Sequence, residues 1–138
     1  MQAQLKLIKN PNESNILLYK IARVVYAETC AASLRVVEAL TAMIENYARI
    51  SGRDFLDIIS DENIFESINR TSARHEYLTI DAQNRGFKMC LRVVERMLHG
   101  NLEDMCCGAT KFHRADLMPN WAISRGYIAD IDGLLFYL

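Results

Sequence analysis

The sequence has no excess of charge of either sign and no long apolar run. Sixteen Lys and Arg residues stand against 17 Asp and Glu residues, which leaves a formal net charge of −1. This balance does not indicate a nucleic-acid partner. No window is apolar enough to span a bilayer, and residues 1–10 lack the apolar stretch of a signal peptide. We therefore expect no nucleic-acid ligand and no stable membrane insertion.

Cysteines are few and irregularly spaced. The four stand at positions 30, 90, 106 and 107, without a Cys-x-x-Cys pair. This spacing predicts neither a disulfide framework nor a zinc site, and it favours four thiols. Cys106 and Cys107 together with His113 make a poor zinc site, because adjacent cysteines are badly placed to chelate one ion. We predict no metal ligands.

Internal repeats, low-complexity tracts and interdomain linkers are also absent from the sequence. A chain of 138 residues, about half of them hydrophobic, has the size of one domain with one core. We predict a single domain over residues 1–138, in which residues 1–13 form an N-terminal extension.

Apolar residues recur at helical spacing through the first two thirds of the chain. The first helix carries Leu17, Ile21, Val24 and Val25, with Glu28 on the same stripe, and Asn12 or Ser14 is a suitable N-cap. Three further segments are predicted as a helix from near Ser33 to before Gly52, a short helix around residues 55–59, and a helix capped by Asp81 that ends at His99 and Gly100. The polar stretch 60–79 is predicted to be a long functional loop.

Beyond Gly100 the pattern changes to that of short β-strands. Residues 109–113 include the β-favouring Thr110 and Phe112, and Asp132-Gly133 separates two mostly apolar arms, 128–131 and 134–138. Helices followed by a strand and a hairpin predict a mainly helical α+β domain.

Glu28 is the residue whose position is most informative about chemistry. It lies on the apolar stripe near the C-terminal end of its helix, where burial and the helix dipole both disfavour a negative charge. A carboxyl group in such a place is suited to donate a proton to a glycosidic oxygen. The alternative is a frayed helix end with Glu28 in water, and periodicity does not distinguish the two. His75 and His99 receive no catalytic assignment.

A series of short motifs gives this placement a context. In order they are Tyr26-Ala27-Glu28, Asn46, Ile64-Phe65-Glu66-Ser67, Gly108 to His113, Pro119 to Ala122, and Phe136-Tyr137. In order and spacing, from about residue 16 to its C-terminus, the chain resembles the SleB-type cell wall hydrolases, the spore cortex-lytic family.

The resemblance implies a small lysozyme- or transglycosylase-like domain that acts on bacterial peptidoglycan. The implied activity is that of a lytic transglycosylase or muramidase, which cuts between N-acetylmuramic acid and N-acetylglucosamine without a metal or organic cofactor. The catalytic Glu of the family falls on Glu28. The residues predicted to bind substrate are Asn46, Phe65, Glu66, Thr110, His113, Trp121 and Tyr137. Ordinary core packing is the alternative role for Trp121.

The chain departs from the family pattern at several positions. The second acidic residue of the family is missing after Glu28, where the chain has Thr29-Cys30-Ala31-Ala32, and Tyr47, Lys111 and Leu134 replace an Arg and two histidines. These differences keep a second hypothesis open, a non-catalytic or weakened peptidoglycan-binding or assembly module. A third hypothesis is a metal-dependent amidase that acts on the peptide stems.

The implied place of action is the cell wall. Because no signal peptide is visible, we expect a chain made in the cytoplasm that acts in the periplasm or outside the cell after export or release. A pore-forming export partner is one hypothesis for that route. We expect the protein to be a monomer.

Overall fold

The protein has a mainly helical α+β fold with one small antiparallel sheet, as the sequence predicts. A computed structural model describes residues 16–138. The predicted extension 1–13 and the N-cap expected at Asn12 or Ser14 lie outside the described residues. In chain order the elements are α2 (Leu17–Thr29), α3 (Leu34–Ser51), α4 (Phe55–Ile59), η1 (Glu66–Ile68), η2 (His75–Thr79), α5 (Arg85–Leu98), β1 (Lys111–Arg114), η3 (Asn120–Ala122), β2 (Ala129–Ile131) and β3 (Leu134–Tyr137), where η denotes a 3-10 helix.

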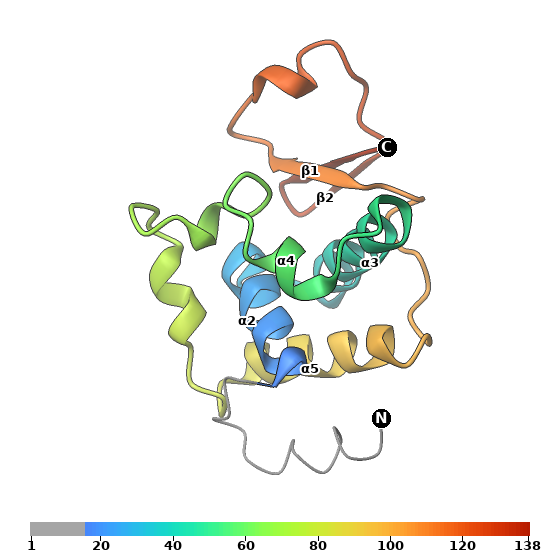
Figure 1. Cartoon of the computed structure of the whole chain (residues 1–138). Helices are drawn as coiled ribbons and strands as arrows, with labels where there is room; N and C mark the ends of the chain where they lie inside the picture. The colour runs from blue at the N-terminus through green and yellow to red at the C-terminus, as the bar shows by residue number, and fades with distance from the viewer. Residues whose placement is uncertain (1–15) are drawn as a thin grey trace.

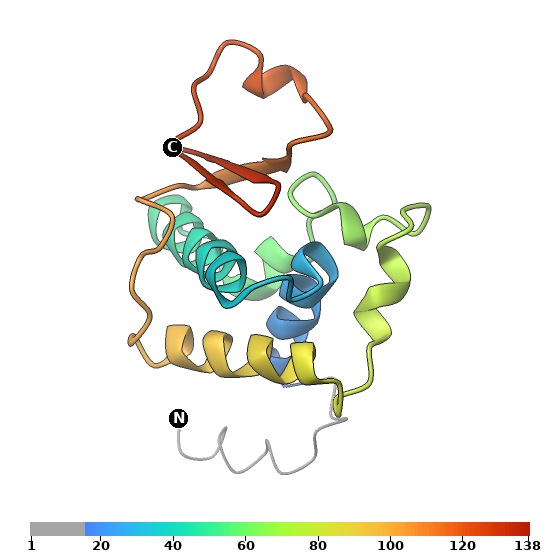
Figure 2. The same ribbon diagram turned by 180° about the vertical axis from the view of Figure 1, so that it is seen from behind.

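Helix α2 lies at the centre of the helical body. It contacts α3, α4, α5 and the 3-10 helices η1 and η2. Its buried side chains therefore extend around most of its surface, and Ile21, Ala22 and Val25 are fully covered. Figures 1 and 2 show the sheet on one side of this body and α5 on the opposite side. Within residues 16–138, no helix is both long and apolar enough to cross a membrane.

The ends of α3 are those that the sequence predicts. The Ser33 side chain accepts a hydrogen bond from the Val36 amide at the start, and Gly52 ends the helix with a φ of 76°. The predicted cap of α5 was wrong by three residues. Asn84 is the N-cap and accepts from the Phe87 amide, whereas the Asp81 carboxylate accepts from the Gln83 amide in a turn before the helix. Both residue types cap helices, so composition alone did not separate them.

The polar stretch 60–79 is folded rather than an open loop. It contains η1 and η2, and both pack on α2. Phe65 anchors its first half with a fully buried side chain. Arg23 of α2 holds its end, because one guanidinium nitrogen donates to the carbonyl oxygens of Leu78 (3.3 Å) and Ile80 (2.6 Å). The stretch therefore forms a fixed wall beside the C-terminal end of α2.

The sheet has the strand order β1-β3-β2, and both pairings are antiparallel. The predicted hairpin at Asp132-Gly133 is confirmed. These two residues have φ angles of 48° and 83°, as a two-residue turn between right-twisted strands requires. Phe112 of β1 is paired with Phe136 of β3, and both side chains are buried in the core. The connection from β1 to β2, residues 115–128, projects away from the helical body (Figures 1 and 2).

Helix α2 ends in a tight turn that fixes the position of its last residues. Cys30 and Ala31 both have φ angles near 50°, and the Thr29 hydroxyl donates to the Val25 carbonyl while accepting from the Ala31 amide. The start of α5 lies against this turn. A Cβ atom at Gly86 would come within 2.8 Å of the Ala31 Cβ, so only glycine allows this approach. The end of α2 is thereby held on two sides.

All four cysteines are unpaired, two exposed (Cys30, Cys107) and two buried (Cys90, Cys106). Burial raises the pKa of both Cys90 and Cys106 to about 12. Because the thiolate is the reactive form, we expect iodoacetamide at about pH 8 to label the two exposed cysteines first. The two buried cysteines should react only when the protein unfolds. Mass spectrometry of timed samples measures this order, and equally fast labelling of all four in the folded protein would contradict it.

Candidate active site

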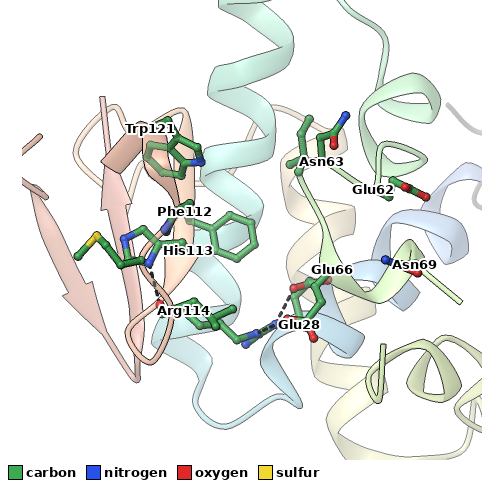
Figure 3. A pocket seen from close by; sticks show the side chains of 13 residues that line it. Glu28, Glu62, Asn63, Glu66, Asn69, Phe112, His113, Arg114 and Trp121 are labelled. Atoms are coloured by element: carbon green, nitrogen blue, oxygen red, sulfur yellow. Dashed lines mark hydrogen bonds and ion pairs between the residues drawn. The ribbon is translucent and has the colours of Figure 1, made fainter. Parts of the chain in front are cut away.

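A cavity of about 460 Å³ lies between the sheet and the folded polar stretch (Figure 3). One wall comes from β1 and the segment that follows it, and it is mainly apolar and aromatic: Phe112, His113, Arg114, Leu117, Met118, Pro119 and Trp121. The other wall is mainly polar and acidic: Glu62, Asn63, Ile64, Glu66 and Asn69. Glu28 of α2 also lines the cavity. Three segments that are distant in sequence therefore meet at one cavity.

Glu28 is buried, with 1% of its surface exposed, so the alternative of a frayed end in water does not hold. Its two carboxylate oxygens have separate donors. Oε2 accepts a hydrogen bond from the Ser67 backbone amide at 2.8 Å, and Oε1 accepts from Nη2 of Arg114 at 2.6 Å. Both donors stabilise negative charge on Glu28 and fix the orientation of its carboxyl group.

Arg114 connects the two walls of the cavity. It stands at the end of β1, and its side chain extends across to Glu28 and Glu66 (Figure 3). Besides the Glu28 contact, its Nε donates to Oε1 of Glu66 at 3.4 Å. One guanidinium thus serves two carboxylates. Arg114 could not be assigned a role from the sequence, because no local pattern relates it to a carboxylate 86 positions earlier in the chain.

Glu66 remains ionised in this arrangement. Its pKa lies below the usual value for a glutamate, because the Ser72 hydroxyl donates to Oε2 at 2.7 Å and because Arg114 is nearby. Partial burial opposes this effect. With Glu62, the polar wall carries two acidic residues in addition to Glu28. The cavity therefore has more carboxylates than cations.

His75 supports the donor that holds Glu28. Its Nδ1 lies 2.8 Å from the Ser67 carbonyl oxygen, which joins η2 to η1. The carbonyl can only accept, so Nδ1 carries the proton of this hydrogen bond. His75 therefore holds Ser67 at its carbonyl group, while the amide of the same residue, which belongs to the preceding peptide group, faces Glu28. No sequence pattern indicates this role, because the contact depends on how two short turns pack.

The aromatic side of the cavity is a packed group of three rings. His113 stacks on Tyr137 with 5.3 Å between ring centroids, and Trp121 meets both rings edge-on at 5.7 and 5.0 Å. His113 Nδ1 lies 2.7 Å from the Arg114 carbonyl oxygen, and its Nε2 lies 2.8 Å from the Tyr137 hydroxyl. Of these rings, His113 and Trp121 line the cavity, and the buried Tyr137 packs against both of them.

The predicted substrate-binding residues do not all meet at this cavity. Glu66, His113 and Trp121 line it together with Glu28, whereas Asn46 and Phe65 do not. Asn46 instead donates to the Ala109 carbonyl (3.1 Å) and to the Asp104 carboxylate (3.3 Å), and it fixes the approach to β1. Phe65 packs in the core against Phe112, with 5.9 Å between ring centroids. These contacts give both side chains structural partners.

A second hollow of about 230 Å³ adjoins the first cavity. Thr110, another predicted residue, lines this hollow, and Tyr137 borders a separate hollow near the C-terminus. Four residues line both the first cavity and the second hollow: Asn63, Ile64, Phe112 and Trp121. The two spaces therefore meet at Trp121 and offer room for an extended ligand.

Among residues 16–138, no group of three or more His, Cys, Asp and Glu side chains lies close enough together to hold a metal ion. Cys106 and His113, considered together from the sequence, have different partners. The Cys106 thiol lies 3.3 Å from an Asp104 carboxylate oxygen, and His113 contacts Tyr137.

No protein-family model, curated protein or solved structure matches this chain. Any function assigned to the chain therefore depends on the chemistry of the cavity and on the motifs of the sequence.

Proposed function

We propose that this protein cleaves the glycan strands of bacterial peptidoglycan, with Glu28 as general acid and base. The observation that carries the proposal is a buried carboxyl group, held by two fixed donors, in a cavity with one aromatic wall and one polar wall. Under this proposal the bond cut lies between N-acetylmuramic acid and N-acetylglucosamine. The domain then belongs with the lysozyme-like transglycosylases and the SleB-type hydrolases that its motifs resemble.

The two unlike walls suit a sugar ring. A pyranose has apolar faces and a rim of hydroxyl and N-acetyl groups. Trp121 and Phe112 offer apolar surface to such a face. On the opposite wall Asn63 has both a donor and an acceptor for the rim, and Asn69 has its amide donor, because its side-chain oxygen already accepts from the Thr71 amide and hydroxyl. A few polar groups opposite an apolar surface are typical of small-molecule sites.

Arg114 and Glu66 allow Glu28 to hold a proton. When Glu28 is protonated, Arg114 still has the ionised Glu66 as a partner, so no buried cation is left alone. The proton of Glu28 then passes to the leaving glycosidic oxygen as the bond to the muramyl C1 breaks. The resulting carboxylate is stabilised by Arg114 and by the Ser67 amide. It next removes the proton of the muramyl C6 hydroxyl, whose oxygen attacks C1, so one carboxyl group serves both steps.

The product distinguishes this route from hydrolysis. Because one carboxyl group serves both steps, we expect fragments that end in 1,6-anhydro-N-acetylmuramic acid when purified sacculi are digested. Mass spectrometry of the soluble fragments measures this directly. Ordinary reducing ends would contradict internal attack and would require a second carboxylate. Glu66 would then be the candidate, since Arg114 joins it to Glu28. Asp132 lies outside the cavity, hydrogen-bonded to the Ser33 hydroxyl.

One observation favours a second function, a module that binds peptidoglycan without cutting it. Nη2 of Arg114 lies 2.6 Å from Oε1 of Glu28, so the carboxyl group that would have to donate the proton is engaged in an ion pair. If substrate binding does not release this pair, the cavity holds glycan and performs no chemistry. Binding to sacculi without any new glycan ends, at every pH tested, would favour the module.

A further inference from the structure

The second hollow contains one charged side chain, that of Lys111. The residues that line it are otherwise neutral: Tyr47, Asn63, Ile64, Thr110, Phe112 and Trp121. Among the described residues, no carboxylate forms an ion pair with Lys111. Its Nζ instead lies 5.6 Å from the centroid of the Trp121 ring. Within residues 16–138, Lys111 is therefore a cation without an anionic partner, beside a hollow that a ligand can enter.

The two spaces that meet at Trp121 have opposite charge. Among the described residues, three carboxylates line the first cavity, those of Glu28, Glu62 and Glu66, and Arg114 is the single arginine or lysine there. The second hollow has only the charge of Lys111. A ligand that lies across Trp121 thus meets negative charge at one end and positive charge at the other. An anionic group on that ligand is favoured at Lys111 and disfavoured beside Glu28.

We propose that Lys111 binds a carboxylate of the wall glycan on the side of Trp121 away from Glu28. The inference rests on the proposed function and adds to it a residue that determines specificity. In peptidoglycan the muramyl residues bear carboxylates, either on the lactyl ether itself or on the peptide stem attached to it, and the N-acetylglucosamine residues bear none. Because the two sugars alternate, a cation that binds only the muramyl carboxylate determines which sugar occupies each position along the site. Lys111 thereby determines which of the two glycosidic bonds lies at Glu28.

The single tryptophan of the chain provides the readout. Trp121 lines both spaces, so its fluorescence reports ligands that enter either one. The Glu28→Gln background prevents turnover during the titration. Three ligands separate the sources of the charge: chitin oligosaccharides without a carboxylate, glycan fragments with free lactyl carboxylates, and the same fragments with peptide stems.

The variants are Lys111→Met, which keeps the length of the side chain but removes the charge, and Lys111→Arg, which keeps the charge. The matched control is Lys88→Met, because Lys88 is exposed on α5, outside both spaces. We expect Lys111→Met to weaken binding of a carboxylate-bearing ligand by about 3- to 10-fold and to leave chitin binding unchanged. Lys111→Arg should retain most of the affinity. Added salt should reduce the preference of the protein for carboxylate-bearing ligands over chitin.

The ligands also locate the carboxylate. A loss of affinity with the free-lactyl fragment alone supports the lactyl carboxylate, because the stem-bearing fragment carries that group as an amide. A loss with the stem-bearing fragment alone supports a carboxylate of the stem, and a loss with both shows that Lys111 binds either one. If Lys111→Met loses affinity equally for chitin and for the charged fragments, or loses affinity for none of the ligands, the role of Lys111 is overturned. The proposed function is unaffected by either result. If the parent with intact Lys111 binds none of the three ligands, the proposed function and this inference both fail.

Discussion

Replacing Glu28 with Gln is expected to lower the rate of glycan-strand cleavage by about 10²- to 10⁴-fold, the usual contribution of a general acid or base. Gln has the same length and can still accept the hydrogen bond of the Ser67 amide, but it cannot exchange the proton. Binding to peptidoglycan should therefore persist. The rate is measured as release of labelled fragments from sacculi, and binding is measured by co-sedimentation.

The matched control for this variant is Glu38→Gln. Glu38 also pairs with an arginine, Arg96 at 2.9 Å, but it is on α3 and does not line the cavity. Its replacement removes a similar charge and should leave the cleavage rate near that of the wild type. Circular dichroism confirms folding of both variants. A rate for Glu28→Gln within a few-fold of the wild type would contradict the assignment of Glu28 as the acid and base.

Replacing Arg114 with Met is expected to lower the free energy of unfolding by about 3 kcal/mol, because removal of one partner leaves a buried charge unpaired. Glu28 is 1% exposed and would keep only the Ser67 amide as a donor. Glu66 also loses a partner, but its side chain is 44% exposed and water can replace the contact. Urea denaturation at neutral pH measures the loss.

A double-mutant cycle isolates the interaction of Arg114 with Glu28. In the Glu28→Gln background the buried charge is absent, so Arg114→Met should lower the free energy of unfolding by a smaller amount. We expect a coupling energy of at least about 1 kcal/mol between the two replacements. The exposed pair of Arg96 and Glu38 serves as a control, with a coupling of about 0.2–1 kcal/mol. Additive effects of the two replacements would show that the short Arg114–Glu28 contact contributes nothing to stability.

The elements that could be predicted from the sequence are those specified by neighbouring residues. Helix α3 begins after Ser33, whose side chain accepts a hydrogen bond from the first turn, and it ends at Gly52, which adopts a left-handed conformation. Both effects involve only residues of the adjacent turn. Asp132-Gly133 makes a hairpin because both residues tolerate a positive φ. The spacing of apolar residues also placed Glu28 on a buried stripe. It did not separate Asn84 from Asp81 as the cap of α5, since both suit that position.

The partners of Glu28 could not be predicted in the same way. Arg114 comes from a strand, and the other donor is a backbone amide at Ser67, which has no side-chain signature. Asn46 illustrates the opposite case, a polar residue that a motif made conspicuous. Asn46 was predicted to bind substrate; it does not line the cavity, and its amide donates to the carbonyl of Ala109. Tertiary packing decides which polar groups face a cavity and which support its walls.

The most direct test of the central claim is a count of new glycan ends by mass spectrometry after purified sacculi are incubated with the wild type and, in parallel, with Glu28→Gln. We expect the wild type to release fragments with new ends at the muramyl residue and the variant to release almost none, although both bind the sacculi. New ends produced equally by both proteins, or by neither, would contradict the assignment of Glu28 as the acid and base of a glycan-cleaving enzyme.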